Sequence, residues 1–97
     1  MEEQEIKEIY DRCNAATNGP WKSLVEGRDI QSSDSFIMTG VIDSKDIWNS
    51  KRGSDIYITG ATIEDQDFIA NARQDIPKLL EEIVKLKAEL EKKNNVG

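Results

Sequence analysis

The sequence predicts an α+β fold in one domain: an N-terminal helix, a three- to four-stranded antiparallel sheet, and two consecutive C-terminal helices. Apolar residues recur at helical spacing near the N-terminus, β-branched and aromatic residues gather in the middle, and leucines recur near the C-terminus. A chain of 97 residues suits a single small core. We therefore expect helix within residues 1–18, strands within 21–60, helix within 62–93 and a frayed tail at 94–97.

The N-terminal helix is expected over residues 2–17. Ile6, Ile9 and Cys13 recur every three or four positions, which places them on one face of a helix. Pro20, in the motif TNGPW, cannot continue the helix because it lacks a backbone N–H group. The segment WKSLVE, which starts at the end of this motif, is expected to be extended.

The middle of the chain favours β-structure. The segments SFIMTGVI, DIWN and DIYIT are rich in β-branched and aromatic residues, and turn-forming residues separate them. In the last segment Ile56 and Ile58 are two positions apart, so both point to one face of a strand. A sheet with one face covered by helices fits this pattern.

Two helices are expected in the C-terminal part. Thr62 is a typical N-cap residue, and Asp65 places a negative charge in the first turn that follows. A proline costs about 3 kcal/mol inside a helix but is tolerated in a first turn. Because Pro77 follows Asp75 closely, we expect the chain to break near Asp75, which would be the N-cap of a second helix.

The final helix carries a heptad pattern. Its apolar residues occupy alternating a and d positions: Ile76, Leu79, Ile83, Leu86 and Leu90. Glu82 at g and Lys87 at e would meet across a parallel pair of helices. This short leucine-spaced tail predicts a homodimer or a higher homo-oligomer.

The predicted core combines the apolar faces of the helices with one face of the sheet. Its expected members are Ile6, Ile9, Cys13, Trp21, Ile56, Ile58, Phe68, Ile69, Ala72, Leu79 and Ile83. A core aromatic such as Phe68 should contribute about 3 to 5 kcal/mol to the free energy of unfolding.

Composition excludes several classes of function. The chain has 19 acidic and 13 basic residues and a net charge of −6, which opposes general binding to nucleic acid. It has no histidine and one cysteine, so it lacks the commonest general base, the commonest zinc ligand and any internal disulfide. No segment approaches the roughly 20 apolar residues of a membrane span, and the acidic N-terminus is not a signal peptide. We expect a cytoplasmic protein that is not an enzyme and binds no metal or cofactor.

Two separated motifs carry a resemblance to a known group of proteins. The segment AATNGPW, followed far downstream by DFIANARQDIPKLL and the leucine-spaced tail, resembles small phage and prophage accessory proteins, and is distantly similar to Ead-like early proteins. Asn18 stands where the group usually has proline, and residues 22–60 match nothing in its pattern. The resemblance implies an accessory gene of an infected or lysogenic bacterium, and it supplies no reaction.

The candidates for ligand binding are aromatic and polar residues that the predicted packing does not use. Aromatic rings stack on bases, and arginine guanidinium groups hold phosphates through paired hydrogen bonds. The candidate residues are Arg73, Asn71, Trp48, Tyr57, Arg28 and Arg52. Arg73 has two interpretations: it contacts an anionic ligand, or it forms an ion pair with Asp75 or Asp67.

Two hypotheses for the function follow. In the first, a homo-oligomeric phage counter-defence protein acts as a sponge that sequesters a nucleotide immune messenger, with aromatic rings on the bases and arginines on the phosphates. In the second, an inhibitor or adaptor binds a host defence protein through its acidic surface or an exposed sheet edge. Neither hypothesis requires catalytic residues.

Overall fold

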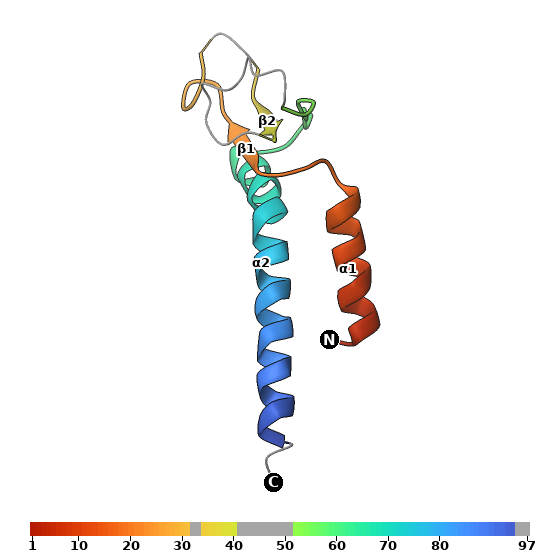
Figure 1. The fold of residues 1–97 in the computed structure, drawn as a ribbon. Helices are drawn as coiled ribbons and strands as arrows, with labels where there is room; N and C mark the ends of the chain where they lie inside the picture. The colour runs from red at the N-terminus through yellow and green to blue at the C-terminus, as the bar shows by residue number, and fades with distance from the viewer. Residues whose placement is uncertain (32–33, 41–51, 95–97) are drawn as a thin grey trace.

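The computed structural model describes residues 1–31, 34–40 and 52–94, in the order helix, strand, strand, helix. The long helix α2 (Ile63–Asn94) runs through a molecule of 63 × 28 × 20 Å, with a small sheet at one end and helix α1 (Glu3–Ala15) beside it (Figure 1). This arrangement confirms the α+β class. Among the described residues, no helix combines the length and the apolar character that crossing a membrane requires.

Helix α1 forms where the periodicity predicts it, although it ends at Ala15, earlier than expected. At its start the Glu2 N–H group donates a hydrogen bond of 3.4 Å to Glu5 Oε1, and the acidic first turn suits the free N–H groups there. Ile6 is buried, whereas Ile9 is half-buried. The helix therefore packs through a narrow apolar face.

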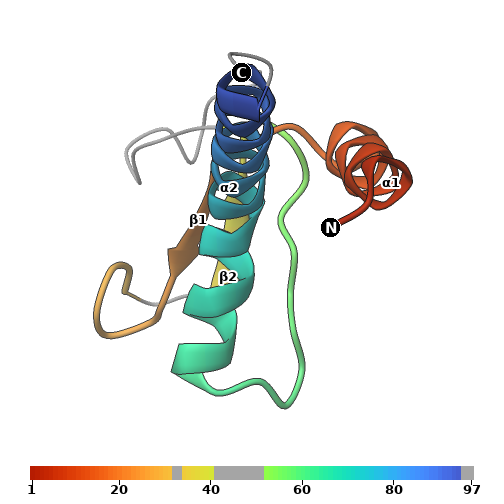
Figure 2. The same ribbon diagram turned by 90° about the horizontal axis from the view of Figure 1, so that it is seen from below.

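The sheet consists of two antiparallel strands among the described residues, β1 (Trp21–Leu24) and β2 (Phe36–Thr39). An isolated bridge between Ile37 and Ile56 adds backbone hydrogen bonds of 2.8 and 2.9 Å on the β2 side. Within the described ranges the sheet has fewer strands than the three to four expected: the chain leaves it after Ile56 and runs to the start of α2 (Figure 2). The segment DIWN, residues 46–49, lies outside the described residues.

Gln66 of α2 attaches the helix to both strands. Its Nε2 atom lies 2.8 Å from Ser23 Oγ and 3.2 Å from the carbonyl oxygens of Leu24 and Phe36. The amide is buried beside a core cluster of Leu24, Phe36 and Met38. A polar side chain is stable there because the strands supply acceptors for its N–H groups.

The start of α2 is capped as the sequence predicts. The Asp65 N–H group donates to Thr62 Oγ1 at 3.0 Å, and the Thr62 N–H group donates to Asp65 Oδ2 at 3.1 Å. This reciprocal pair satisfies two backbone donors that would otherwise be free, so the helix begins at Ile63.

Helix α2 is continuous, so the predicted break near Asp75 is wrong. Pro77 lies inside the helix, where it removes one backbone hydrogen bond. Tertiary contacts hold the helix on both sides of this position: Gln74 bonds to β1, and Leu80 is buried. These contacts offset the local cost of the proline, which propensity alone does not include.

The predicted core is wrong for three residues, since Phe68 is 75% exposed, Leu79 is 62% exposed and Ile69 is also exposed. Helix α2 turns a different face to the sheet, and that face carries Gln66 and Ala70. Apolar periodicity predicts that the Phe68 face of α2 packs on the sheet. The face that packs there is instead the one that carries Gln66, because its side chain bonds to both strands. The other predicted members are buried or half-buried: Ile6, Ile9, Cys13, Trp21, Ile56, Ile58, Ala72 and Ile83.

Candidate functional site

The two motifs that are far apart in the sequence meet in the structure. The Thr17 carbonyl oxygen accepts a hydrogen bond from Arg73 Nε and another from the Trp21 indole Nε1, both at 3.0 Å. A Cβ atom placed on Gly19 would lie 3.5 Å from Arg73 Cγ, so this turn lies directly against α2. The segments AATNGPW and FIANARQ therefore form one local structure.

Gln74 strengthens this junction by pairing with the backbone of β1. Its Oε1 atom accepts from the Trp21 N–H group at 2.7 Å, and its Nε2 atom donates to the Trp21 carbonyl oxygen at 3.0 Å. One side-chain amide thus satisfies both backbone groups of Trp21. The contact fixes where β1 begins and holds the indole ring near α1 and α2.

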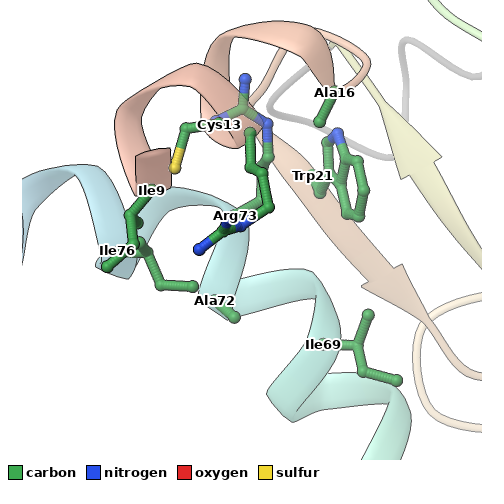
Figure 3. A pocket seen from close by; sticks show the side chains of 9 residues that line it. Ile9, Cys13, Ala16, Trp21, Ile69, Ala72, Arg73 and Ile76 are labelled. Carbon is green, nitrogen blue, oxygen red and sulfur yellow. The ribbon is translucent and has the colours of Figure 1, made fainter. Parts of the chain in front are cut away.

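A pocket of about 260 Å³ lies between α1 and α2, next to this junction (Figure 3). Trp21 and Ile69 lie at one end of it, and Ile9 and Ile76 lie at the other. The residues that line it are Ile9, Arg12, Cys13, Ala16, Trp21, Ile69, Ala72, Arg73 and Ile76. The lining is mostly apolar, and its charged members are arginines.

Arg12 and Arg73 give the pocket a positive edge in an acidic protein. In the described ranges neither residue belongs to an ion pair, and Arg73 commits only its Nε atom to Thr17. No carboxylate lines the pocket. Because electrostatic interactions weaken with distance, these two cations can attract an anionic group at the pocket although the net charge of the chain is −6.

Arg73 does not pair with Asp67 or Asp75, the acidic partners considered from the sequence. Asp67 pairs instead with Arg28, whose Nη1 and Nη2 atoms lie 2.8 and 2.9 Å from the two carboxylate oxygens. This contact, together with a weaker one from the Ser23 hydroxyl, lowers the pKa of Asp67 to about 2. Arg28 also bonds to Asp29 at 2.9 Å, so its guanidinium group is committed to the fold.

Two further predicted site residues also make local contacts away from the pocket. Asn71 donates to the Asp67 carbonyl oxygen at 2.8 Å and lies on the outer face of α2. Arg52 bonds to the Asp55 carboxylate, which raises the pKa of Arg52. Neither residue lines the pocket that contains Arg73.

The predicted aromatic residues do not line the pocket within the described part of the chain. Tyr57 is exposed, and its ring centroid lies 5.6 Å from that of Phe36 over the sheet. Trp48 lies outside the described residues. The ring that the structure brings to Arg73 is that of Trp21, which was expected in the core.

Arg12 is absent from the residues that the sequence nominates. It lies one helical turn before Ala16, in the helix that ends where the first motif begins, while Arg73 lies inside the second motif. The sequence contains one indication of Arg12: each of the two motifs that occur together has an arginine in it or next to it. The missing information was that the motifs touch.

Nothing in the described ranges resembles a metal centre, since no cluster of His, Cys, Asp and Glu side chains there could hold an ion. Comparisons with family models, with curated proteins and with solved structures give no match. The pocket is therefore interpreted from its own residues.

Proposed function

We propose that the protein binds a small nucleotide-type ligand in the pocket between α1 and α2 and catalyses no reaction on it. The observation that carries the proposal is an apolar lining with an indole ring and two arginines but no carboxylate. A base would pack against the Trp21 ring, while phosphate oxygens would accept hydrogen bonds from Arg12 and Arg73.

The resemblance of the two motifs to phage accessory proteins supplies the biological context of this proposal. In that context the protein acts as a counter-defence sponge, which lowers the free concentration of a nucleotide immune messenger in the infected cell. Sequestration requires tight binding and no catalytic group, which agrees with the absence of histidine from the chain.

Binding of a host protein along a sheet edge has less support. At the β1 edge, Gln74 already occupies the backbone N–H and carbonyl groups of Trp21. At the β2 edge, Ile37 is paired with Ile56. An added strand would have to displace these hydrogen bonds, whereas a ligand in the pocket would displace none of them.

Calorimetric titration with ADP-ribose and with a cyclic dinucleotide tests the proposal. Arg73→Ala and Arg12→Ala should each weaken binding about tenfold, since each removes charge-assisted hydrogen bonds to phosphate. Lys85→Ala is the matched control, because it removes an equal charge from an exposed position of α2 outside the pocket.

Two results of this titration would contradict the proposal. If neither probe binds, and denaturing the purified protein releases no ultraviolet-absorbing ligand, the nucleotide assignment is wrong. If a probe binds but both arginine variants match the Lys85→Ala control, the ligand lies elsewhere. Circular dichroism of each variant establishes that it is folded before binding is compared.

A further inference from the structure

The apolar row on the outer face of α2 is longer than the sequence predicts, because the helix continues through Pro77. We call this row the α2 seam. Its a positions are Ile69, Ile76, Ile83 and Leu90, and its d positions are Ala72, Leu79 and Leu86. Most of these side chains are exposed in one chain, including Leu90 at 60%.

We infer that the α2 seam pairs in parallel with the α2 seam of a second copy of this chain. β-branched residues at a combined with leucine at d favour two parallel strands. The seam has isoleucine at three of its four a positions and leucine at two of its three d positions. An exposed apolar row of this length is a typical protein-binding surface. Its heptad pattern is complementary to the same pattern on a second copy of the chain.

The charges beside the seam select the parallel direction. The g positions other than Phe68 are acidic: Asp75, Glu82 and Glu89. The e positions carry no acidic residue: Arg73, Leu80, Lys87 and Asn94. In a parallel pair each g residue faces the e residue five positions later in the partner, whereas an antiparallel pair would set carboxylates against carboxylates.

Helix α1 leaves most of the seam exposed. It packs beside the e positions, where Lys87 Nζ donates to the Met1 carbonyl oxygen and Leu80 is buried. A shallow groove of about 420 Å³ follows the N-terminal half of the seam between Phe68 and Leu79. The small side chain of Ala72 lies within this groove and leaves room for side chains of a second helix.

The same register brings the second copy to the ligand pocket. Phe68 is 75% exposed and occupies a g position, so the partner's Phe68 would lie against Arg73 and make a cation–π contact. Ile69, Ala72 and Ile76 belong to both the seam and the pocket. The second copy therefore closes the open side of the pocket, a consequence that rests on the proposed function.

The size of the pocket supports this closure. Its volume of about 260 Å³ lies below the roughly 300 to 1,000 Å³ of sites that enclose small ligands. A second helix across its mouth would add a wall and an aromatic ring. The site would then be complete only in the dimer.

Disulfide cross-linking tests the pairing and its direction. In a Cys13→Ser background, Leu86→Cys places a thiol at a d position, which faces itself only in a parallel pair. Lys85→Cys is the control, because this neighbouring position points away from the seam. Mild oxidation at micromolar concentration should convert Leu86→Cys to a covalent dimer and leave Lys85→Cys largely monomeric. Equal yields for the two variants, or a mass of 11.0 kDa for the unmodified protein by light scattering, would overturn the pairing.

Phe68→Ala tests the closure of the pocket separately. This variant should remain dimeric and bind ADP-ribose about tenfold more weakly. Ile63→Ala, which removes another exposed apolar side chain from α2 but lies off the seam, should change neither property.

The outcomes distinguish the two proposals. A dimer with unchanged ADP-ribose affinity in Phe68→Ala contradicts closure. A cross-linked dimer that binds no nucleotide refutes the proposed function and keeps the pairing. A nucleotide complex with the mass of one chain refutes the pairing and keeps the proposed function.

Discussion

Arg73 on α2 donates a hydrogen bond from Nε to the Thr17 carbonyl oxygen at 3.0 Å, across a separation of 56 positions in the chain. The bond uses one of the five N–H donors of the guanidinium group. It fixes the side chain at the pocket, and in the described part of the chain the terminal nitrogens make no further hydrogen bond or ion pair. A single residue can therefore join the two motifs and contact a ligand.

Gln66 should contribute more to stability than an ordinary helix glutamine, because its amide bonds to both strands in a buried site. Gln66→Leu should lower the free energy of unfolding by about 1 to 3 kcal/mol, since it removes the buried hydrogen bonds between α2 and the two strands. Chemical denaturation gives the difference. The exposed Gln4→Leu is the control and should change stability by no more than about 0.5 kcal/mol.

Pro77 provides a direct test of the continuous helix. In a helix interior, Pro77→Ala restores a backbone hydrogen bond and should raise the free energy of unfolding by about 1 to 3 kcal/mol. If a new helix began at Asp75 instead, the proline would occupy a first turn, and its replacement would stabilise nothing. Thermal and urea unfolding of this variant distinguish the two outcomes.

Two phenylalanines should respond in opposite ways to truncation. Phe36 is 2% exposed, so Phe36→Ala should lower the free energy of unfolding by about 3 to 5 kcal/mol. Phe68→Ala should cost less than about 1 kcal/mol when measured at a concentration low enough to disfavour association. A large loss for Phe68→Ala under those conditions would place its ring in the core of the single chain.

Asp67 should make stability depend on pH below neutrality. Its pKa in the folded protein is about 2, lower than the roughly 3.9 of an unfolded aspartate. The ionised side chain therefore contributes fully to the free energy of unfolding at a pH above the unfolded pKa. The contribution is lost as the pH falls through that range toward 2. Asp67→Asn should therefore be less stable than the parent protein at pH 7, and the difference should disappear near pH 2. A difference that is independent of pH would show that the ion pair with Arg28 contributes nothing.

Features set by neighbouring residues could be predicted from the sequence. The cap at Thr62 and the end of α1 before Pro20 depend on local backbone chemistry, and both are found. The extended segment at β1 follows for the same reason, because Pro20 separates it from the helix.

Features set by contacts between distant segments could not be predicted. Gln66 and Gln74 decide which face of α2 meets the sheet, and periodicity contains no information about backbone acceptors on strands. Contacts of this kind also stabilise the helix on both sides of Pro77, so it continues through the proline. For the candidate site, the sequence predicts Arg73 because the predicted packing does not use it, but Arg12 and Trp21 join it only because the two motifs touch.

The most direct test of the pocket is a titration of isotope-labelled protein with ADP-ribose, followed by nuclear magnetic resonance at the Trp21 indole N–H signal. This group donates to the Thr17 carbonyl oxygen at the edge of the pocket, and a Trp48→Phe variant assigns its signal. A ligand in the pocket should shift the Trp21 signal in a saturable way and leave the amide of Gly27, in the loop after β1, unchanged. An unchanged Trp21 signal at a ligand concentration that saturates other shifts would contradict the account.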